Sequence, residues 1–428
     1  MKILFITYHF PPYNSVGAVR TSKTAKYLIK AGHEVKVLTC SNQSLPSNLS
    51  LEIPEQNVEY TPWLNVNSPV TYVLGGKKQV AAKGYIPSVK HFSGLAYYLG
   101  TFYKDLLNFP DGQIGWFPFA KRAGDKIIRN WKPDMIFASA LPPTSLLIAS
   151  SLARKHNIPW VPELRDLWID NHQWIRPFWR LFYEKKLEKF ILKSACGMVT
   201  VSRPLAETLQ SKYSQPCEII TNGFDPDDYP ASPHPTPSDG LIHLVYTGQI
   251  FGQWRSPGAL FSALALMGEE AEEIRVHFYG RYLDMVLGIA EEHKVSHLVK
   301  IHQPVNHIEA LKAQSEADIL LLIPGTDLKI KGVYTTKLFE YLGARRPILC
   351  IENNRGVASE LIQDREAGVT LHEPEAIARQ LSQWIKQKND DGEIPRLPAN
   401  VGEGFTRKEQ TGKLISFLET CLKKHQST

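Results

Sequence analysis

The sequence is poor in the features that mark several common protein classes. Its 428 residues include only five cysteines, and no two of them are spaced as C-x-x-C, which argues against a zinc site or a disulfide framework. No apolar run approaches the roughly 20 residues that a membrane-spanning helix needs. The apolar start of the chain is too short for the core of a signal peptide. We therefore expect a cytoplasmic protein with reduced thiols.

A glycine-rich dinucleotide motif is also missing. The loop after the first expected strand, residues 8–17, contains one glycine, Gly17, where a dinucleotide-binding fold has G-x-G-x-x-G. This disfavours an NAD- or FAD-dependent oxidoreductase. A single Gly17 at the start of a helix can still bring backbone N–H groups close to a phosphate, although an ordinary turn glycine explains it equally well.

Charge is distributed unevenly along the chain. The net charge is +6, but residues 1–224 carry +12 and residues 225–428 carry −6. Such an asymmetry indicates that the first half faces an anionic partner. A membrane surface and a phosphorylated acceptor both fit. Nucleic acid is disfavoured, because the basic residues form no recognised motif and the second half is acidic.

Strand and helix patterns alternate twice along the chain. In the first half we expect strands at 3–7, 35–38, 135–138, 158–164, 197–201 and 218–221, with helices at 145–155 and 177–194 and a further helix before Gly32; residues 50–130 give no firm pattern. In the second half we expect strands at 243–247, 275–279, 299–302, 317–323 and 347–351, with helices at 257–267, 282–293, 308–314 and 336–343. Such alternation is typical of parallel, doubly wound α/β sheets.

A Pro-rich segment separates the two halves. We expect an N-terminal domain at 1–224, a linker at 225–240, a C-terminal domain at 241–404, and a final helix within 405–428 that packs back on the N-terminal domain. Ligands of doubly wound sheets bind at the carboxyl ends of the strands. Two such domains facing a central cleft therefore direct attention to the loops that follow the strands.

The second half holds the most informative of these loops. Gly248 follows a strand, and Arg255 precedes a helix whose first residue is a proline. Further along, Thr335 or Thr336 can cap a helix that begins at Lys337. Helix N–H groups and the Lys337 ammonium form an anion site, and Glu340, one turn on, can accept hydrogen bonds from ribose hydroxyls. A surface Arg255 and a solvated Lys337–Glu340 pair are the structural alternatives.

Four segments in this order resemble the family-4 retaining glycosyltransferases of the GT-B fold, across essentially the whole chain. They are residues 10–17 with Phe-Pro-Pro and Gly17, residues 221–225, the Thr247-Gly248 pair, and the block 336–349. The resemblance implies a nucleotide diphosphate sugar as donor; UDP is one candidate nucleotide, and the sequence leaves GDP, ADP and CMP sugars open. It further implies Arg255 and Lys337 at the phosphates and Glu340 at the ribose, with the remaining donor contacts from Gly17, Gly248, Thr336 and Leu338.

The chain departs from the family pattern at one donor position. Many members carry a Glu-x7-Glu pair whose second residue matches Glu340, but the first falls on Gly332. Because the missing carboxylate is usually read as holding the donor sugar, sugar identity and rate come into question. Asp327 lies nearby in the sequence, but nothing shows that it substitutes.

On the acceptor side, residues 163–168 look like the Arg-Asp-Leu-Trp variant of envelope-polysaccharide transferases. We expect Asp166 to orient an acceptor hydroxyl or to stabilise positive charge at the anomeric carbon, so that Asp166, Arg255 and Lys337 are the candidate catalytic residues. His9, Glu163 and Arg165 are candidate acceptor contacts, and a structural Arg165–Asp166 pair is the alternative. Asp225 and Asp227 form a D-x-D, which we interpret as a turn.

The function expected is therefore retaining glycosyl transfer from a nucleotide sugar to a lipid-linked or polysaccharide acceptor, as in lipopolysaccharide synthesis, without a metal or other cofactor. A nucleotide-sugar epimerase of the same fold and an inactive sugar-nucleotide-binding protein are the alternatives. Basic and aromatic residues at 77–107 and 174–193 further predict a peripheral contact of the first domain with the inner face of an anionic membrane. A solvated basic face over an ordinary core is the alternative there.

Overall fold

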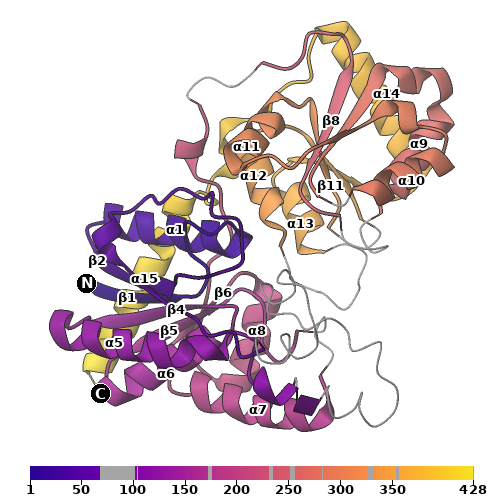
Figure 1. Cartoon of the computed structure of the whole chain (residues 1–428). Coiled ribbons are helices and arrows are strands. Elements are labelled where there is room, and N and C mark those ends of the chain that lie inside the picture. Colours follow the sequence, from indigo (N-terminus) through magenta and orange to yellow (C-terminus); the bar gives the residue numbers. More distant parts are fainter. Residues whose placement is uncertain are drawn as a thin grey trace. The chain divides into compact units, whose positions relative to one another are not determined.

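The computed structural model describes residues 1–67, 102–103, 105–171, 176–230, 235–250, 256–281, 283–324, 332, 334–352 and 356–427. Contacts divide the chain into two units: the first unit comprises residues 1–221 and 411–428, and the second comprises residues 222–410. Each unit is an α/β domain built on one parallel sheet (Figure 1). The first unit is therefore made of two separate stretches of chain.

The first unit contains a seven-stranded parallel sheet in the order β3-β2-β1-β4-β5-β6-β7. Its strands are β1 (Lys2–Thr7), β2 (Glu34–Cys40), β3 (Val58–Thr61), β4 (Met135–Ala140), β5 (Trp160–Leu164), β6 (Met198–Thr200) and β7 (Cys217–Ile219). Its helices are α1 (Val16–Lys30), α5 (Phe117–Trp131), α6 (Thr144–His156), α7 (Phe178–Leu192), α8 (Arg203–Tyr213) and most of α15 (Arg407–Gln426).

Alternate residues of β1 enter cores on opposite faces of this sheet. Leu4 and Ile6 join a core that α5, α6, α7 and α8 cover, whereas Ile3 and Phe5 join a core that α1 and α15 cover. Strands buried on both faces require apolar residues at successive positions, which is why β1 reads as a continuous apolar run. The C-terminal helix α15 lies beside β1 in Figure 1, and its Leu414 packs in the same core as Ile3 and Phe5.

The second unit repeats the design with a six-stranded parallel sheet in the order β10-β9-β8-β11-β12-β13. Its strands are β8 (Ile242–Thr247), β9 (Ile274–Tyr279), β10 (Val299–His302), β11 (Ile319–Leu322), β12 (Ile348–Ile351) and β13 (Gly368–Leu371). Its helices are α9 (Gly258–Met267), α10 (Asp284–Glu292), α11 (His307–Glu316), α12 (Thr336–Ala344), α13 (Val357–Asp364) and α14 (Pro374–Asp391). Leu321 packs with α9, α10 and α14 on one face, and Leu320 with α12 and α13 on the other.

The predicted fold class is confirmed, since both units are parallel α/β domains. Several elements were not predicted: strands β3 and β13 and helices α5, α8, α13 and α14. Short 3-10 segments were also not predicted, except that a turn was expected where η3 (Pro226–Asp228) lies in the Pro-rich segment. None of the helices described is both long and apolar enough to cross a bilayer.

Candidate functional site

In the second unit, Lys337 lies against Gly248 at the carboxyl end of β8. Gly248 has φ +117°, a conformation that glycine adopts readily and other residues rarely do. A Cβ at Gly248 would stand 2.5 Å from Lys337 Cε and 2.8 Å from its Nζ. The ammonium also donates to Tyr246 Oη at 3.1 Å and lies 4.5 Å from the centre of that ring. The absence of a side chain at Gly248 thus makes room for the lysine.

Glu340 follows Lys337 on α12 and is held from α11. Its Oε1 lies 3.3 Å from His307 Nε2, and its Oε2 accepts a hydrogen bond from Gln314 Nε2 at 3.1 Å. Burial alone would raise the pKa of Glu340, but His307, Gln314 and Lys337 bring it below its ordinary value. Glu340 is therefore an oriented carboxylate at neutral pH, on the same helix as the Lys337 ammonium.

The start of α11 determines where His307 stands. Asn306 caps this helix: its side chain accepts from Glu309 N at 2.9 Å, and Glu309 Oε2 accepts from Asn306 N at 3.1 Å. This reciprocal pair fixes the first turn, so that His307 is the first helical residue and reaches Glu340. Gln314, two turns later, also donates to Thr247 Oγ1 at 2.9 Å, which connects Glu340 to the end of β8.

The remaining predicted donor residues occupy different environments. Thr336 is the first residue of α12, and Leu338 is fully buried in the core. The helix predicted at 336–343 is confirmed, since α12 begins at Thr336 and Thr335 is its N-cap residue, although the Thr335 side chain makes no hydrogen bond to the helix. Arg255 and Asp327 lie outside the described residues.

Gly332 has a backbone conformation that disfavours glutamate. It is buried and has φ +91°, in the left-handed region where a residue with a long side chain is strained. This gives a physical reason for glycine at a position where the family resemblance implies a carboxylate.

In the first unit, Glu163 is the acceptor of a buried ion pair with Arg20. Its Oε1 accepts from Arg20 Nε at 3.0 Å and Nη2 at 2.7 Å, and its Oε2 accepts from Ser139 Oγ at 2.5 Å. Arg20 also donates to the carbonyl oxygens of Ile220 and Thr221. Burial alone would raise the pKa of Glu163, but the charge and hydrogen bonds of Arg20 lower it overall. The pair and its hydrogen bonds therefore connect α1 with strands β4 and β5 and with the residues that follow β7.

Arg165 follows β5 and packs its guanidinium against the start of α1. Its Nε donates to the carbonyl oxygen of Ala140 at 2.8 Å, and a Cβ at Gly17 would stand 2.9 Å from its Nη1. Ser15 caps α1 by accepting from Ala18 N at 3.1 Å. The N–H end of α1 and the guanidinium are therefore positive groups close to one another.

Two further predicted residues, His9 and Asp166, are close enough to Arg165 for its charge to affect them. Burial, reinforced by the Arg165 charge, lowers the pKa of His9 to about 4, so that its imidazole is neutral near pH 7. Burial raises the pKa of Asp166, and Arg165 only partly opposes this shift. The loops after β1 and β5 thus bring His9, Gly17, Arg165 and Asp166 to one edge of the first sheet.

The residues that the sequence did not predict are the hydrogen-bond and ion-pair partners of the predicted carboxylates. Arg20, His307 and Gln314 were not predicted, because each lies on a helix and meets its partner only through the fold. The sequence around Arg20 gives no signal of its burial, since Val16, one turn earlier on α1, is 64% exposed.

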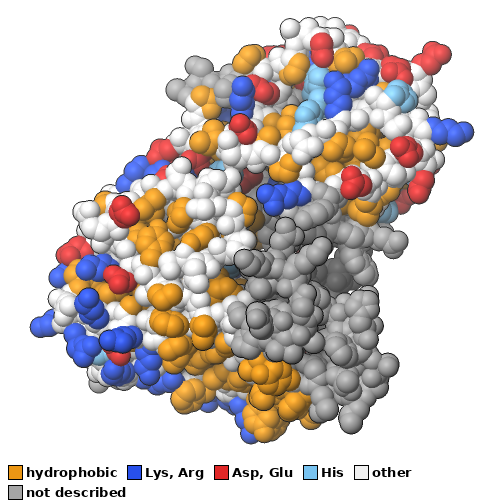
Figure 2. Space-filling model, in the orientation of Figure 1, with side chains coloured by type: hydrophobic (Ala, Val, Ile, Leu, Met, Phe, Trp, Pro, Cys, Tyr) orange, Lys and Arg blue, Asp and Glu red, His pale blue; other side chains and the backbone are white. Residues whose placement is uncertain are grey.

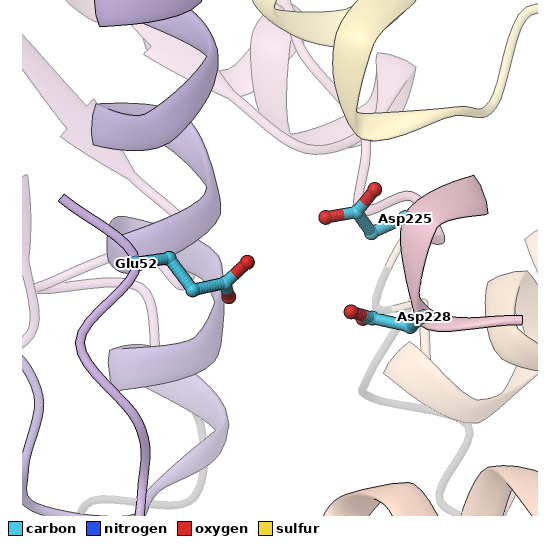
Figure 3. A group of neighbouring side chains, drawn as sticks. All are labelled: Glu52, Asp225 and Asp228. Atoms are coloured by element: carbon cyan, nitrogen blue, oxygen red, sulfur yellow. The ribbon is translucent and has the colours of Figure 1, made fainter.

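The acidic D-x-D segment forms a turn, as predicted. Asp225 precedes η3, its Oδ1 accepts from Asp227 N at 3.0 Å, and Asp228 ends the turn (Figure 3). Glu52, also labelled in Figure 3, belongs to the first unit, where its carboxylate pairs with Lys23 and Lys26 of α1 at 2.8 Å each. That the protein needs no metal stays a prediction.

Two Rossmann-like domains with parallel sheets define the GT-B architecture of glycosyltransferases. The family model described as Glycosyltransferase Family 4 matches residues 85–228. No curated protein matches the chain.

Solved structures match the whole length of the chain at low identity. A sucrose-phosphate synthase from Thermosynechococcus elongatus is 15% identical, with a TM-score of 0.60 over 100% of this chain and 98% of that one. Anabaena HepE (Alr3699) in complex with UDP is 13% identical, with a TM-score of 0.60 over 98% and 100%. A Listeria monocytogenes protein assigned as a UDP-N-acetylglucosamine 2-epimerase is 12% identical, with a TM-score of 0.55 over 99% and 97%. At these identities the likeness establishes the fold.

Proposed function

We propose that this protein transfers a glycosyl group from a UDP-sugar to a hydroxyl group of an acceptor, with retention of anomeric configuration. The observation that carries the proposal is the pairing on α12 of the Lys337 ammonium, seated over Gly248, with the oriented carboxylate of Glu340. A cation suits a diphosphate, and a carboxylate suits the two hydroxyl groups of a ribose. The UDP bound to HepE supports the choice of nucleotide.

In the proposed reaction, the bond between the anomeric carbon and the diphosphate oxygen breaks, and its electron pair leaves with UDP. The acceptor oxygen forms the new bond to the same carbon and loses its proton. Lys337 stabilises the charge that develops on the departing diphosphate, because a fixed cation interacts more strongly with the transition state than with the intact donor. Arg255 supplies a second cation in this proposal.

The first unit supplies the acceptor side in this proposal. Asp166 takes up the acceptor proton or stabilises positive charge at the anomeric carbon, and its raised pKa makes it a stronger base than an exposed aspartate. Arg165 and the start of α1 offer positive charge to a phosphate. Glu163 positions Arg20 and the surrounding strands, since both of its carboxylate oxygens are already engaged. Retention rests on the family resemblance alone.

We also propose a lipid-linked or polysaccharide acceptor and a location at the inner face of a membrane. The support is the net charge of +12 on residues 1–224, which favours anionic partners. No metal enters the proposed chemistry, because Lys337 provides the charge that a divalent ion would otherwise supply.

A nucleotide-sugar epimerase is the second candidate, and the fold shared with the Listeria protein favours it. An epimerase would convert UDP-N-acetylglucosamine without any acceptor. A transferase releases UDP in proportion to the acceptor consumed. Proton NMR of the donor, with and without lipid extract, separates the two, and a protein that binds UDP and changes no donor is the inactive binding protein that Gly332 suggests.

Calorimetry with UDP tests the donor site directly. Lys337→Met removes the phosphate counter-charge, and Glu340→Gln weakens the ribose acceptor. Each should cost about 1.5–3 kcal/mol of binding free energy, the value of a charge-assisted hydrogen bond. The matched control is Lys312→Met, which removes an exposed lysine from α11. Unchanged UDP affinity in both α12 variants, with intact circular dichroism, would overturn the assignment.

A further inference from the structure

Helix α7 presents its aromatic residues to solvent and buries its carboxylates. Phe178 is 85% exposed, Tyr183 56% and Phe190 60%, whereas Glu184 is 0% exposed and Glu188 3%. Surface helices ordinarily show the reverse distribution. An exposed aromatic side chain on its own needs no explanation, but several on a helix that hides its acids indicate a partner.

Both buried carboxylates have hydrogen-bond or ion-pair partners. Glu184 accepts hydrogen bonds from Arg180 Nε at 2.5 Å and pairs with Arg176 Nε at 2.8 Å. Glu188 accepts from Tyr213 Oη at 2.6 Å and from Ile169 N at 3.2 Å. The contacts of Glu188 to Tyr213 and Ile169 fix how α7 is rotated about its axis, and the exposure of the aromatic residues follows from that rotation.

The outward face of α7 carries only positive charge. Lys185, Lys186 and Lys189 are exposed between the aromatic residues. Lys186 Nζ lies 4.2 Å from the centre of the Phe182 ring, and the Arg154 guanidinium lies 4.1 Å from the centre of the Phe190 ring. Cations and aromatic rings are therefore interleaved on one surface.

A neighbouring segment extends this surface. Arg180 donates to the carbonyl oxygens of Asn108 and Pro110, which holds that segment against α7, and the Phe102 ring lies 5.2 Å from the Trp179 ring. We call the combined surface the α7 face; its exposed apolar residues are Phe102, Tyr103, Leu106, Phe178, Phe182, Tyr183 and Phe190. Figure 2 shows hydrophobic side chains gathered over the region of α7, with Lys and Arg side chains at its margin.

The α7 face holds nearly all the exposed aromatic side chains in the part of the chain that the structure describes. Phe119 is the one exposed aromatic residue there that lies outside it, and none belongs to the second unit. The basic–aromatic composition is therefore specific to one surface.

We propose that the α7 face is a docking surface for an anionic lipid bilayer. Aromatic rings are favoured at the boundary between head groups and acyl chains, and lysines are attracted to anionic head groups. A second copy of this chain fits less well, because two such faces would bring lysines together. The inference deepens the proposed function, on whose lipid-borne acceptor it rests, by naming where the lipid lies.

Flotation with vesicles of phosphatidylglycerol and phosphatidylcholine tests the proposal without donor or acceptor. The wild-type protein should float with anionic vesicles and lose this binding as salt increases, since such attractions are screened over about 10 Å at 0.1 M salt. Lys185→Gln/Lys186→Gln/Lys189→Gln should lower the partition coefficient by on the order of a hundredfold, because each lysine near the surface contributes about fivefold. Phe182→Ser/Tyr183→Ser/Phe190→Ser should likewise lower the partition coefficient, because it removes the aromatic rings that enter the interface.

A matched control removes exposed apolar residues from the second unit. Leu266→Ser/Ile308→Ser changes side chains that are 60% and 71% exposed, and this variant should float like the wild type. Flotation that survives both α7 variants overturns the proposal. Absence of flotation for the wild type, together with dimers in sedimentation that the aromatic variant dissociates, would assign the face to a second copy instead. UDP binding, measured separately, distinguishes this failure from failure of the proposed function.

Discussion

The two units use the same sheet topology but place different chemistry after the strands. Both sheets follow the order 3-2-1-4-5-6 when their strands are numbered within each unit, and the first adds one strand. After β1 and β5 the first unit gathers Arg165, Asp166 and a neutral His9 above the buried Arg20–Glu163 pair. After β8 the second unit presents a lysine over a glycine. One fold thus carries two different sets of polar groups, because the segments beyond the strand ends differ between the units while the sheets do not.

The surfaces of the two units differ as much as their sites. Residues 1–224 carry a net charge of +12 and residues 225–428 carry −6. Six of the seven exposed aromatic side chains among the described residues lie on the α7 face, and none lies on the second unit. This difference concerns partners rather than folding, since both sheets bury apolar strand residues in their cores.

The largest effect should come from breaking the buried Arg20–Glu163 ion pair of the first unit. Arg20→Met leaves Glu163 charged and buried without its counter-ion, and should cost about 3–5 kcal/mol of unfolding free energy. Hydrogen exchange should locate the loss in α1, β4 and β5, while β8 and β11 keep their protection.

The double variant Arg20→Met/Glu163→Gln is the control for this prediction. It removes the unpaired charge as well as the pair, and should recover part of the lost stability. A loss in Arg20→Met below about 1 kcal/mol, the value of an exposed ion pair, would mean that the pair is not buried in solution.

The next largest effect should come from substituting Gly248, which lies against Lys337 in the second unit. Gly248→Ala forces φ +117° on a residue with a Cβ, which costs about 1–3 kcal/mol, and drives that Cβ into Lys337. UDP affinity measured by calorimetry should fall by at least about tenfold, because the ammonium is displaced.

Gly240→Ala is a matched control for the loss of stability that comes from placing a Cβ on a residue with positive φ. Gly240 also has a left-handed φ, +78°, but nothing lies within 4 Å of its added Cβ. This variant should lose stability and keep its UDP affinity. Equal UDP affinities in the two variants would contradict the contact between Gly248 and Lys337.

The fold could be predicted because both sheets consist of parallel strands buried on two faces. Apolar runs such as those of β1 and β11 are recognisable in the sequence, and helices with one apolar stripe separate them. Strands β3 and β13 escaped because they are short and only partly buried. Helix α7 was predicted as an element, but its rotation was not, since that depends on Tyr213 and Ile169, the partners of Glu188 outside the helix.

In the candidate site too, contacts within one helix could be predicted from the sequence, whereas contacts between elements could not. Lys337 and Glu340 share one helix, so that three positions of sequence spacing predict their proximity. His307 and Arg20 act across elements, and no local pattern links them to the carboxylates they hold. The conformation of Gly332 is likewise invisible in the sequence, although it explains the absence of a carboxylate there.

A smaller effect should appear in the pH dependence of stability. The pKa of His9 is about 4 in the native state and 6.5 as its ordinary value, so that between these values the unfolded chain binds more protons. Stability contributed by the neutral imidazole is therefore lost as the pH falls from about 6.5 towards 4. His9→Gln should reduce the decline between pH 7 and pH 5 by about 1–2 kcal/mol, measured by urea unfolding of the first unit.

His297→Gln is the matched control for His9→Gln, because it changes an exposed histidine of the second unit that pairs with Glu272. Its unfolding free energy at pH 7 and at pH 5 gives the reference for the loss of a histidine that is not buried. A decline that His9→Gln leaves unchanged would mean that His9 is hydrated in solution.

The smallest expected effect is that of removing metal ions, and it tests whether the second unit supplies its own positive charge. In the proposed reaction Lys337 faces the diphosphate, so that transfer measured as UDP release should be the same with and without EDTA. The Asp225 carboxylate accepts a hydrogen bond from Asp227 N and caps η3, which is a structural role. Loss of activity in EDTA that magnesium or manganese restores would contradict this expectation. Asp227→Asn would then test whether the D-x-D segment binds the ion: a lower apparent affinity for the metal would assign it there, and an unchanged one would direct the search to other carboxylates.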